Sequence, residues 1–149
     1  KVAMSPLPNI EPVSLLVMLY AAVLGWPGLC CVYLYVLLEI LFYGIQLWNI
    51  NYLYIWAILF VAARLLRNMR HPLAWAILSG AFGALFGALC APVYAVTGGM
   101  QAAVGWWISG IPYDLLHCAG NFTIALALFC PLRTQLTALS KKLLIQIPD

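Results

Sequence analysis

The sequence predicts an all-α integral membrane protein, and two features of its composition lead to that fold class. Of the 149 residues, 66% are hydrophobic and only 7% are charged. A water-soluble domain of this length needs more charged side chains to cover its surface. The apolar residues also form continuous runs without the alternation of strands, so the runs indicate helices. We therefore expect a single domain of membrane-spanning helices over residues 1–149, embedded in a lipid bilayer.

Several classes of function lose support because their sequence features are missing. A net charge of +3 is too small and too scattered for a protein that binds nucleic acid. The five cysteines have no C-x-x-C spacing, so we expect neither a disulfide framework nor a zinc site. The sequence has no G-x-x-x-x-G-K-[ST] phosphate loop, no H-E-x-x-H and no G-x-S-x-G. We therefore expect no catalysis, cofactor or metal in this chain.

The chain opens with a loop and a short apolar helix. Three prolines in residues 5–12 (SPLPNIEP) predict a loop, with Glu11 at the membrane edge. The apolar run over residues 13–25 is short for a span, and Trp26-Pro27-Gly28 predicts a tight turn after it. Because the sequence begins at Lys1 without an initiator Met, we expect that a leading helix is missing.

The second predicted span covers residues 29–47 and contains one ionisable residue, Glu39, near its middle. An ionised carboxylate at the centre of a membrane helix costs about 2.5–3.5 kcal/mol. Tyr35, Tyr43 and Gln46 share the helix face of Glu39. Two interpretations stay open: a protonated Glu39 bonded to a neighbouring tyrosine, or a contact with a ligand or a coupling partner.

Aromatic residues surround the start of the third predicted span, over residues 52–66. The sequence WNINY predicts a short polar and aromatic turn before it. Tyr52 and Trp56 lie one helical turn apart and so form one aromatic wall. They are either interface anchors or, together with Asn49 and Asn51, part of a stacking pocket.

The fourth predicted span, over residues 73–96, is rich in small side chains. Gly80 and Ala84 form one row at four-residue spacing, and Gly83 and Gly87 form another. Such rows let two helices approach closely, so we expect a structural role for this span.

The last predicted span, over residues 111–132, follows a Gly-rich loop predicted over residues 97–109. Asp114, His117 and Asn121 fall within one narrow arc of this helix. Polar groups in hydrocarbon lose their water partners, so the stripe should face a protein interior or a wet cavity. It contributes either to a functional site or to a polar clasp between helices.

The basic residues sort onto one side of the predicted spans. They are Arg64, Arg67, Arg70, Arg133, Lys141 and Lys142. The positive-inside rule places the loop Arg64–His71 and an amphipathic tail over residues 134–147 in the cytoplasm. The loops that carry Trp48, Trp107 and Asp114 then face outward, and a pocket that they enclose is suited to capture a solute.

Three segments of the sequence form a recognisable set. They are PNIEPV before the first helix, YLYIW in the third span, and GIPYDLLHCAGNF in the last span with Pro131-Leu132 at its far end. This set resembles the substrate-binding (S) components of energy-coupling factor (ECF) vitamin transporters. The pattern G-x-P-x-D-x-x-H-x-x-x-N is its most specific part, and the resemblance covers most of the chain.

The resemblance implies a six-helix bundle, of which five spans are present here and the first is missing. It also implies a multi-pass protein of a prokaryotic cell membrane that binds a vitamin or a related small heterocyclic micronutrient from outside. In that family the S component works in a complex with a transmembrane coupling (T) protein and two cytoplasmic ATPases. ATP hydrolysis is therefore expected in partner chains.

The residues expected to bind the solute come from the polar stripe and from the resemblance. Asp114, His117 and Asn121 are expected to hydrogen-bond the polar edge of a flat ring, while aromatic side chains stack on its face. The other candidates are Glu11, Glu39, Trp48, Asn49, Tyr52, Trp56, Trp107 and Tyr113. The alternatives are a structural membrane subunit without ligand, or an intramembrane enzyme that combines the stripe with Glu39 and His71. The predicted topology argues against the enzyme, because it places His71 in the cytoplasm.

Overall fold

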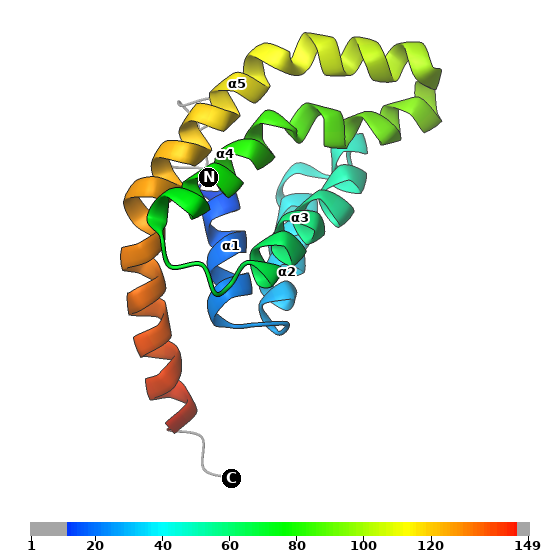
Figure 1. Cartoon of the computed structure of the whole chain (residues 1–149). Helices are drawn as coiled ribbons and strands as arrows, with labels where there is room; N and C mark the ends of the chain where they lie inside the picture. The colour runs from blue at the N-terminus through cyan, green and yellow to red at the C-terminus, as the bar shows by residue number, and fades with distance from the viewer. Residues whose placement is uncertain (1–11, 146–149) are drawn as a thin grey trace.

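The structure is a computed structural model that describes residues 12–145, and every regular element in that range is a helix. The helices are α1 (Val13–Val23), α2 (Gly28–Tyr43), α3 (Leu47–Leu65), α4 (Pro72–Ala84) and α5 (Phe86–Ile145). The predicted all-α class is confirmed. Figure 1 shows α1, α2 and α3 gathered beside a long helical pair that α4 and α5 form.

Helix α5 folds back on itself at Gly99. This residue has φ 81° and ψ 175°, a conformation that is open almost only to glycine. We call residues 86–98 the first arm and residues 100–145 the second arm. In Figure 1 the second arm runs back beside the first arm and α4, and its C-terminal end extends beyond the other helices.

The predicted loop over residues 97–109 is wrong, because both sides of Gly99 are helical. Tyr94 and Trp106 stack across the turn with ring centroids 3.9 Å apart and planes at 15°. A contact between residues on opposite sides of the turn stabilises helix where local glycine content favours a loop. The same helix continues through Pro131 to Ile145, so the described part of the predicted tail belongs to α5.

The junction of α2 and α3 also differs from the prediction. Helix α2 ends at Tyr43, before Gly44 with φ 78°, so Gln46 does not lie on the face of Glu39. Gln46 instead caps α3: its side chain and the Asn49 side chain each accept a hydrogen bond from the other's backbone N–H. This reciprocal cap starts α3 at Leu47, and the turn predicted from WNINY is wrong.

Small residues set the distance between α4, the first arm and the second arm. A Cβ at Gly83 would lie 2.7 Å from the carbonyl carbon and oxygen of His117. One at Gly80 would lie 3.2 Å from the Cβ of Phe122. The prediction that these glycines permit close helix packing is confirmed. A short break at Leu85 separates α4 from α5, so the expected single helix over residues 73–96 is two.

The core lies where α1 contacts α2, α3 and the second arm. Met18 and Ile55 are fully enclosed there, and Trp75 of α4 stacks on Phe129 with centroids 4.0 Å apart. By length and composition, one described stretch, Pro72–Leu143, is apolar enough to cross a membrane, because it contains an 18-residue window with a mean hydropathy of 1.9. α1 and α2 are shorter apolar helices. The structure is thus an all-α bundle with one candidate membrane-spanning stretch.

Candidate functional site

A cavity of about 380 Å³ lies between α1, α3 and both arms of α5. Its volume is within the range of pockets that hold small organic ligands. Aromatic side chains form most of its wall: Tyr43, Trp48, Tyr52, Trp56, Phe86, Tyr94 and Trp106. The remaining lining residues are Val13, Ser14, Asn51, Cys90, His117 and Asn121. We call this space the aromatic cavity.

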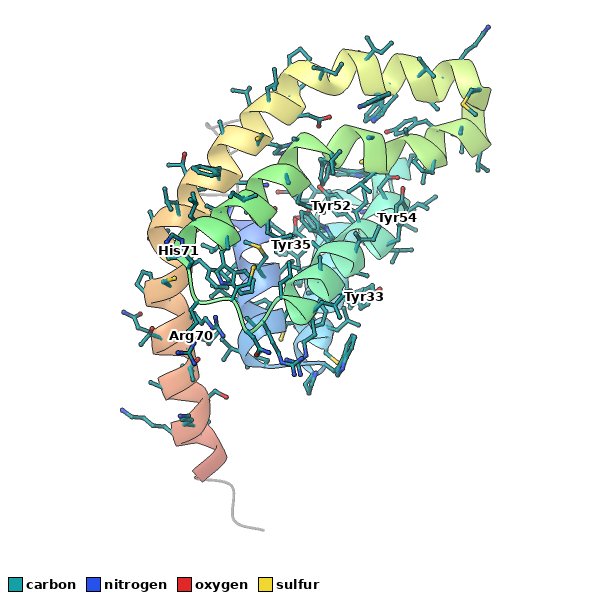
Figure 2. All side chains as sticks on the ribbon, in the orientation of Figure 1. Tyr33, Tyr35, Tyr52, Tyr54, Arg70 and His71 are labelled. Atoms are coloured by element: carbon teal, nitrogen blue, oxygen red, sulfur yellow. The ribbon has the colours of Figure 1, made fainter. Side chains whose placement is uncertain are left out.

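Helix α3 supplies one side of the aromatic cavity as a ladder of three rings. Trp48, Tyr52 and Trp56 recur every four residues and therefore share one helix face. Their ring centroids are 5.7 Å and 5.4 Å apart along the ladder. Tyr35 of α2 packs behind Tyr52, with ring centroids 6.4 Å apart (Figure 2). The ring centroids of Phe86 and Trp56 are 6.0 Å apart. The wall expected from the spacing of Tyr52 and Trp56 is present and is longer than expected.

Polar groups enter this wall at a few positions. Asn121 donates from Nδ2 to the Ser14 hydroxyl at 3.1 Å, which ties the second arm to α1. On α3, the Tyr54 hydroxyl lies 2.6 Å from the Leu89 carbonyl oxygen and 3.1 Å from Oδ1 of Asn51. These bonds fix the side-chain amides of Asn51 and Asn121 at the cavity. Neither amide uses all of its hydrogen-bonding capacity in these bonds.

Two nitrogens of lining residues are buried without a hydrogen-bond partner in the described part of the chain. They are Nε1 of Trp56 and Nδ1 of His117. The His117 ring packs against Phe86 with centroids 5.1 Å apart. Both atoms are enclosed by protein, and a buried polar group without a partner costs about 1–3 kcal/mol.

Asp114 has a different role from the other two residues of the predicted stripe. Both of its carboxylate oxygens accept hydrogen bonds from the Gly87 N–H, at 3.0 Å and 3.1 Å. It lines a second cavity of about 280 Å³, together with Tyr113. This cavity shares Phe86 and His117, among others, with the aromatic cavity. The stripe is therefore divided: His117 and Asn121 line the aromatic cavity, and Asp114 joins the two arms of α5.

The other predicted site residues fall into two groups. Trp48, Tyr52 and Trp56 line the aromatic cavity, whereas Asn49, Glu39 and Trp107 do not. Asn49 is buried at the start of α3, where its Oδ1 accepts the Gln46 N–H at 2.6 Å. Glu39 is buried on α2, Trp107 is 46% exposed, and Glu11 lies outside the described residues.

Several lining residues were not predicted, and Trp106 is the most informative of them. It lies eleven residues before His117, which is close to three full turns of helix, so the two side chains share a face. Trp107 lies on another face. This spacing identifies Trp106 once residues 100–117 are taken as helix. Ser14, Phe86 and Tyr94 reach the cavity only through packing between helices.

The two histidines occupy separate places. Nδ1 of His71 accepts a hydrogen bond from the Leu73 N–H at 3.2 Å, so this side chain caps the start of α4. His71 is labelled in Figure 2. His117 lies instead beside Phe86 at the aromatic cavity. The residues of the proposed intramembrane enzyme therefore do not form one cluster. Within the described residues, no group of three His, Cys, Asp or Glu side chains is placed to hold a metal ion.

Comparisons with known proteins give no family assignment. No protein-family model, curated protein or solved structure matches this chain at a significant level.

Proposed function

We propose that this chain is the substrate-capture subunit of an ECF-type importer that binds a vitamin or a related planar heterocycle from outside the cell. The observation that carries this proposal is the aromatic cavity, because its ring-lined wall and few polar groups suit one small flat ligand. The resemblance of GIPYDLLHCAGNF and its companion segments to S components supplies the transport context.

The surface of the helices supports a location in a bilayer. Large apolar side chains cover outward faces of α2, α3 and the second arm, including Leu41 at 69% and Phe42 at 78% exposure. Buried positions include the polar residues Ser14, Asn51, Ser79 and Asn121. A water-soluble protein rarely leaves such extended apolar surface open, whereas lipid tails cover it without cost. We therefore propose a multi-pass membrane protein.

The charges support an outward-facing cavity. Helix α3 carries the aromatic ladder in its first half and Arg64 in its last turn. Arg133 of the second arm donates to the carbonyl oxygens of Arg67 and Met69, at 2.7 Å and 3.0 Å. The basic residues thus gather at the end of α3 that is distant from the ladder. With the basic end in the cytoplasm, the cavity lies toward the outside.

Delivery across the membrane requires partners in this proposal. The sequence has no phosphate loop for ATP, so two cytoplasmic ATPases and a transmembrane coupling protein would drive import. These partners are proposed from the resemblance to S components. The cavity supports the capture step alone.

Ligand binding by the purified protein tests the proposal. We expect one or a few members of a vitamin panel to quench tryptophan fluorescence, because three tryptophans line the cavity. Tyr52→Ala should weaken binding by about tenfold or more, since stacking on one aromatic ring contributes about 1–3 kcal/mol. Tyr113→Ala, at an exposed ring outside the aromatic cavity, is the matched control.

The result that would contradict the proposal is a folded protein that responds to no vitamin in the panel. Uptake normalised to protein abundance distinguishes the capture subunit from a structural subunit without ligand. A structural subunit without ligand predicts that Tyr52→Ala changes abundance only, whereas the capture subunit predicts lower uptake at equal abundance.

A further inference from the structure

The charge inventory of the aromatic cavity restricts its ligand. None of its lining residues in the described part of the chain is Lys, Arg, Asp or Glu. A more open hollow shares four aromatic residues with this cavity and is also lined by Gln46 and Leu47, and none of its lining residues among those described is charged. The second cavity contains one carboxylate, Asp114, and that carboxylate is bonded to the Gly87 N–H. The basic residues Arg70, Arg133 and Lys141 line a separate surface hollow formed with the second arm.

An anionic ligand would therefore enter a ring-lined space without an opposite charge among the described residues. Burial of an unpaired phosphate or carboxylate is strongly unfavourable. Binding proteins that select phosphate groups use arginine, lysine or rows of backbone N–H groups. His117 is the one described lining residue whose ordinary pKa lies near neutrality, and it packs against Phe86.

The polar groups at the wall are suited to a neutral ring edge. The amides of Asn51 and Asn121 each carry both a donor and an acceptor, and each has one hydrogen-bond contact within the protein. A planar heterocycle that alternates donors and acceptors along its edge, such as a ring amide, matches these groups while its faces stack on the aromatic wall.

We infer that the ligand of the aromatic cavity is a planar heterocycle without phosphate or carboxylate groups, whose edge carries both hydrogen-bond donors and acceptors. This inference rests on the proposed capture function and narrows it. It excludes phosphate esters and carboxylated rings as high-affinity ligands.

The first experiment identifies the ligand that the full chain retains during purification from cells grown in rich medium, by mass spectrometry. The second titrates matched pairs by calorimetry: riboflavin against riboflavin 5′-phosphate, and pyridoxine against pyridoxine 5′-phosphate. The expected result is a retained ligand without phosphate or carboxylate groups and, for any ring that binds, a phosphate ester at least tenfold weaker than the unphosphorylated form.

The outcomes separate this inference from the capture function. A retained or preferred ligand that is phosphorylated or carboxylated overturns the inferred ligand class and leaves capture intact. A folded protein that retains no ligand and binds no vitamin in the panel overturns both.

Discussion

Asp114 is only 6% exposed, and its carboxylate is directed at the backbone of the first arm. From the sequence, its position on one face with His117 and Asn121 made all three equivalent candidates for ligand binding. The structure distinguishes them, because hydrogen bonds to the Gly87 N–H occupy both carboxylate oxygens of Asp114. At this scale a residue's role depends on which atoms its neighbours leave free, and helical spacing alone does not contain that information.

We predict that Asp114→Ala lowers the stability of the protein by about 1–3 kcal/mol, because it leaves the buried Gly87 N–H without an acceptor. Asp114→Asn retains one acceptor oxygen in nearly the same shape and should lose less. Thermal unfolding of both variants in detergent, followed by circular dichroism, measures the difference. If Asp114→Ala unfolds at the wild-type temperature, the carboxylate does not join the arms.

The pairing of α4 with α5 is the main contact between elements, and it depends on glycine at positions of closest approach. The rows of small residues in the sequence predicted close packing correctly, because the absence of a side chain is visible in any sequence. The sequence does not show which surface these glycines pack against. Gly83 meets the backbone of His117, thirty-four residues away along the chain, only because α5 folds back at Gly99.

We predict that Gly83→Ala destabilises the bundle by about 1–3 kcal/mol, because its Cβ would overlap the His117 carbonyl at 2.7 Å and force the helices apart. Gly105→Ala is the control, since no atom lies within 4 Å of the added Cβ and alanine favours helix over glycine. Unfolding temperatures that rank Gly105→Ala below Gly83→Ala would contradict the packing geometry.

The whole molecule combines an apolar exterior, a ring-lined cavity and a basic end. Each feature has a sequence counterpart in the apolar runs, the aromatic clusters and the arginine distribution. Their arrangement along the axis of α3, with the ladder near its start and Arg64 in its last turn, supports one orientation in the bilayer. That orientation is open to a direct measurement.

We predict opposite membrane accessibility for the two ends of the bundle. In a background that lacks the five native cysteines, Ile45→Cys should react with a membrane-impermeant maleimide added to intact cells. Lys141→Cys should react only after the cells are opened. Ile45 is 87% exposed beside the start of α3, and Lys141 is exposed on the second arm. Labelling of both positions from the same side would reject the proposed topology.

The amino-acid sequence by itself determined the helical class, the shared helix face of Tyr52 and Trp56, and the close-packing glycines. Each of these follows from composition or from spacing within one segment. Only the tertiary structure decided that residues on both sides of Gly99 are helical, that Trp106 and not Trp107 lines the cavity, and that Asp114 joins the two arms. The physical reason is that these features depend on contacts between distant residues, such as Tyr94 with Trp106 and Gly87 with Asp114, which override the local preference of a glycine-rich segment for a loop.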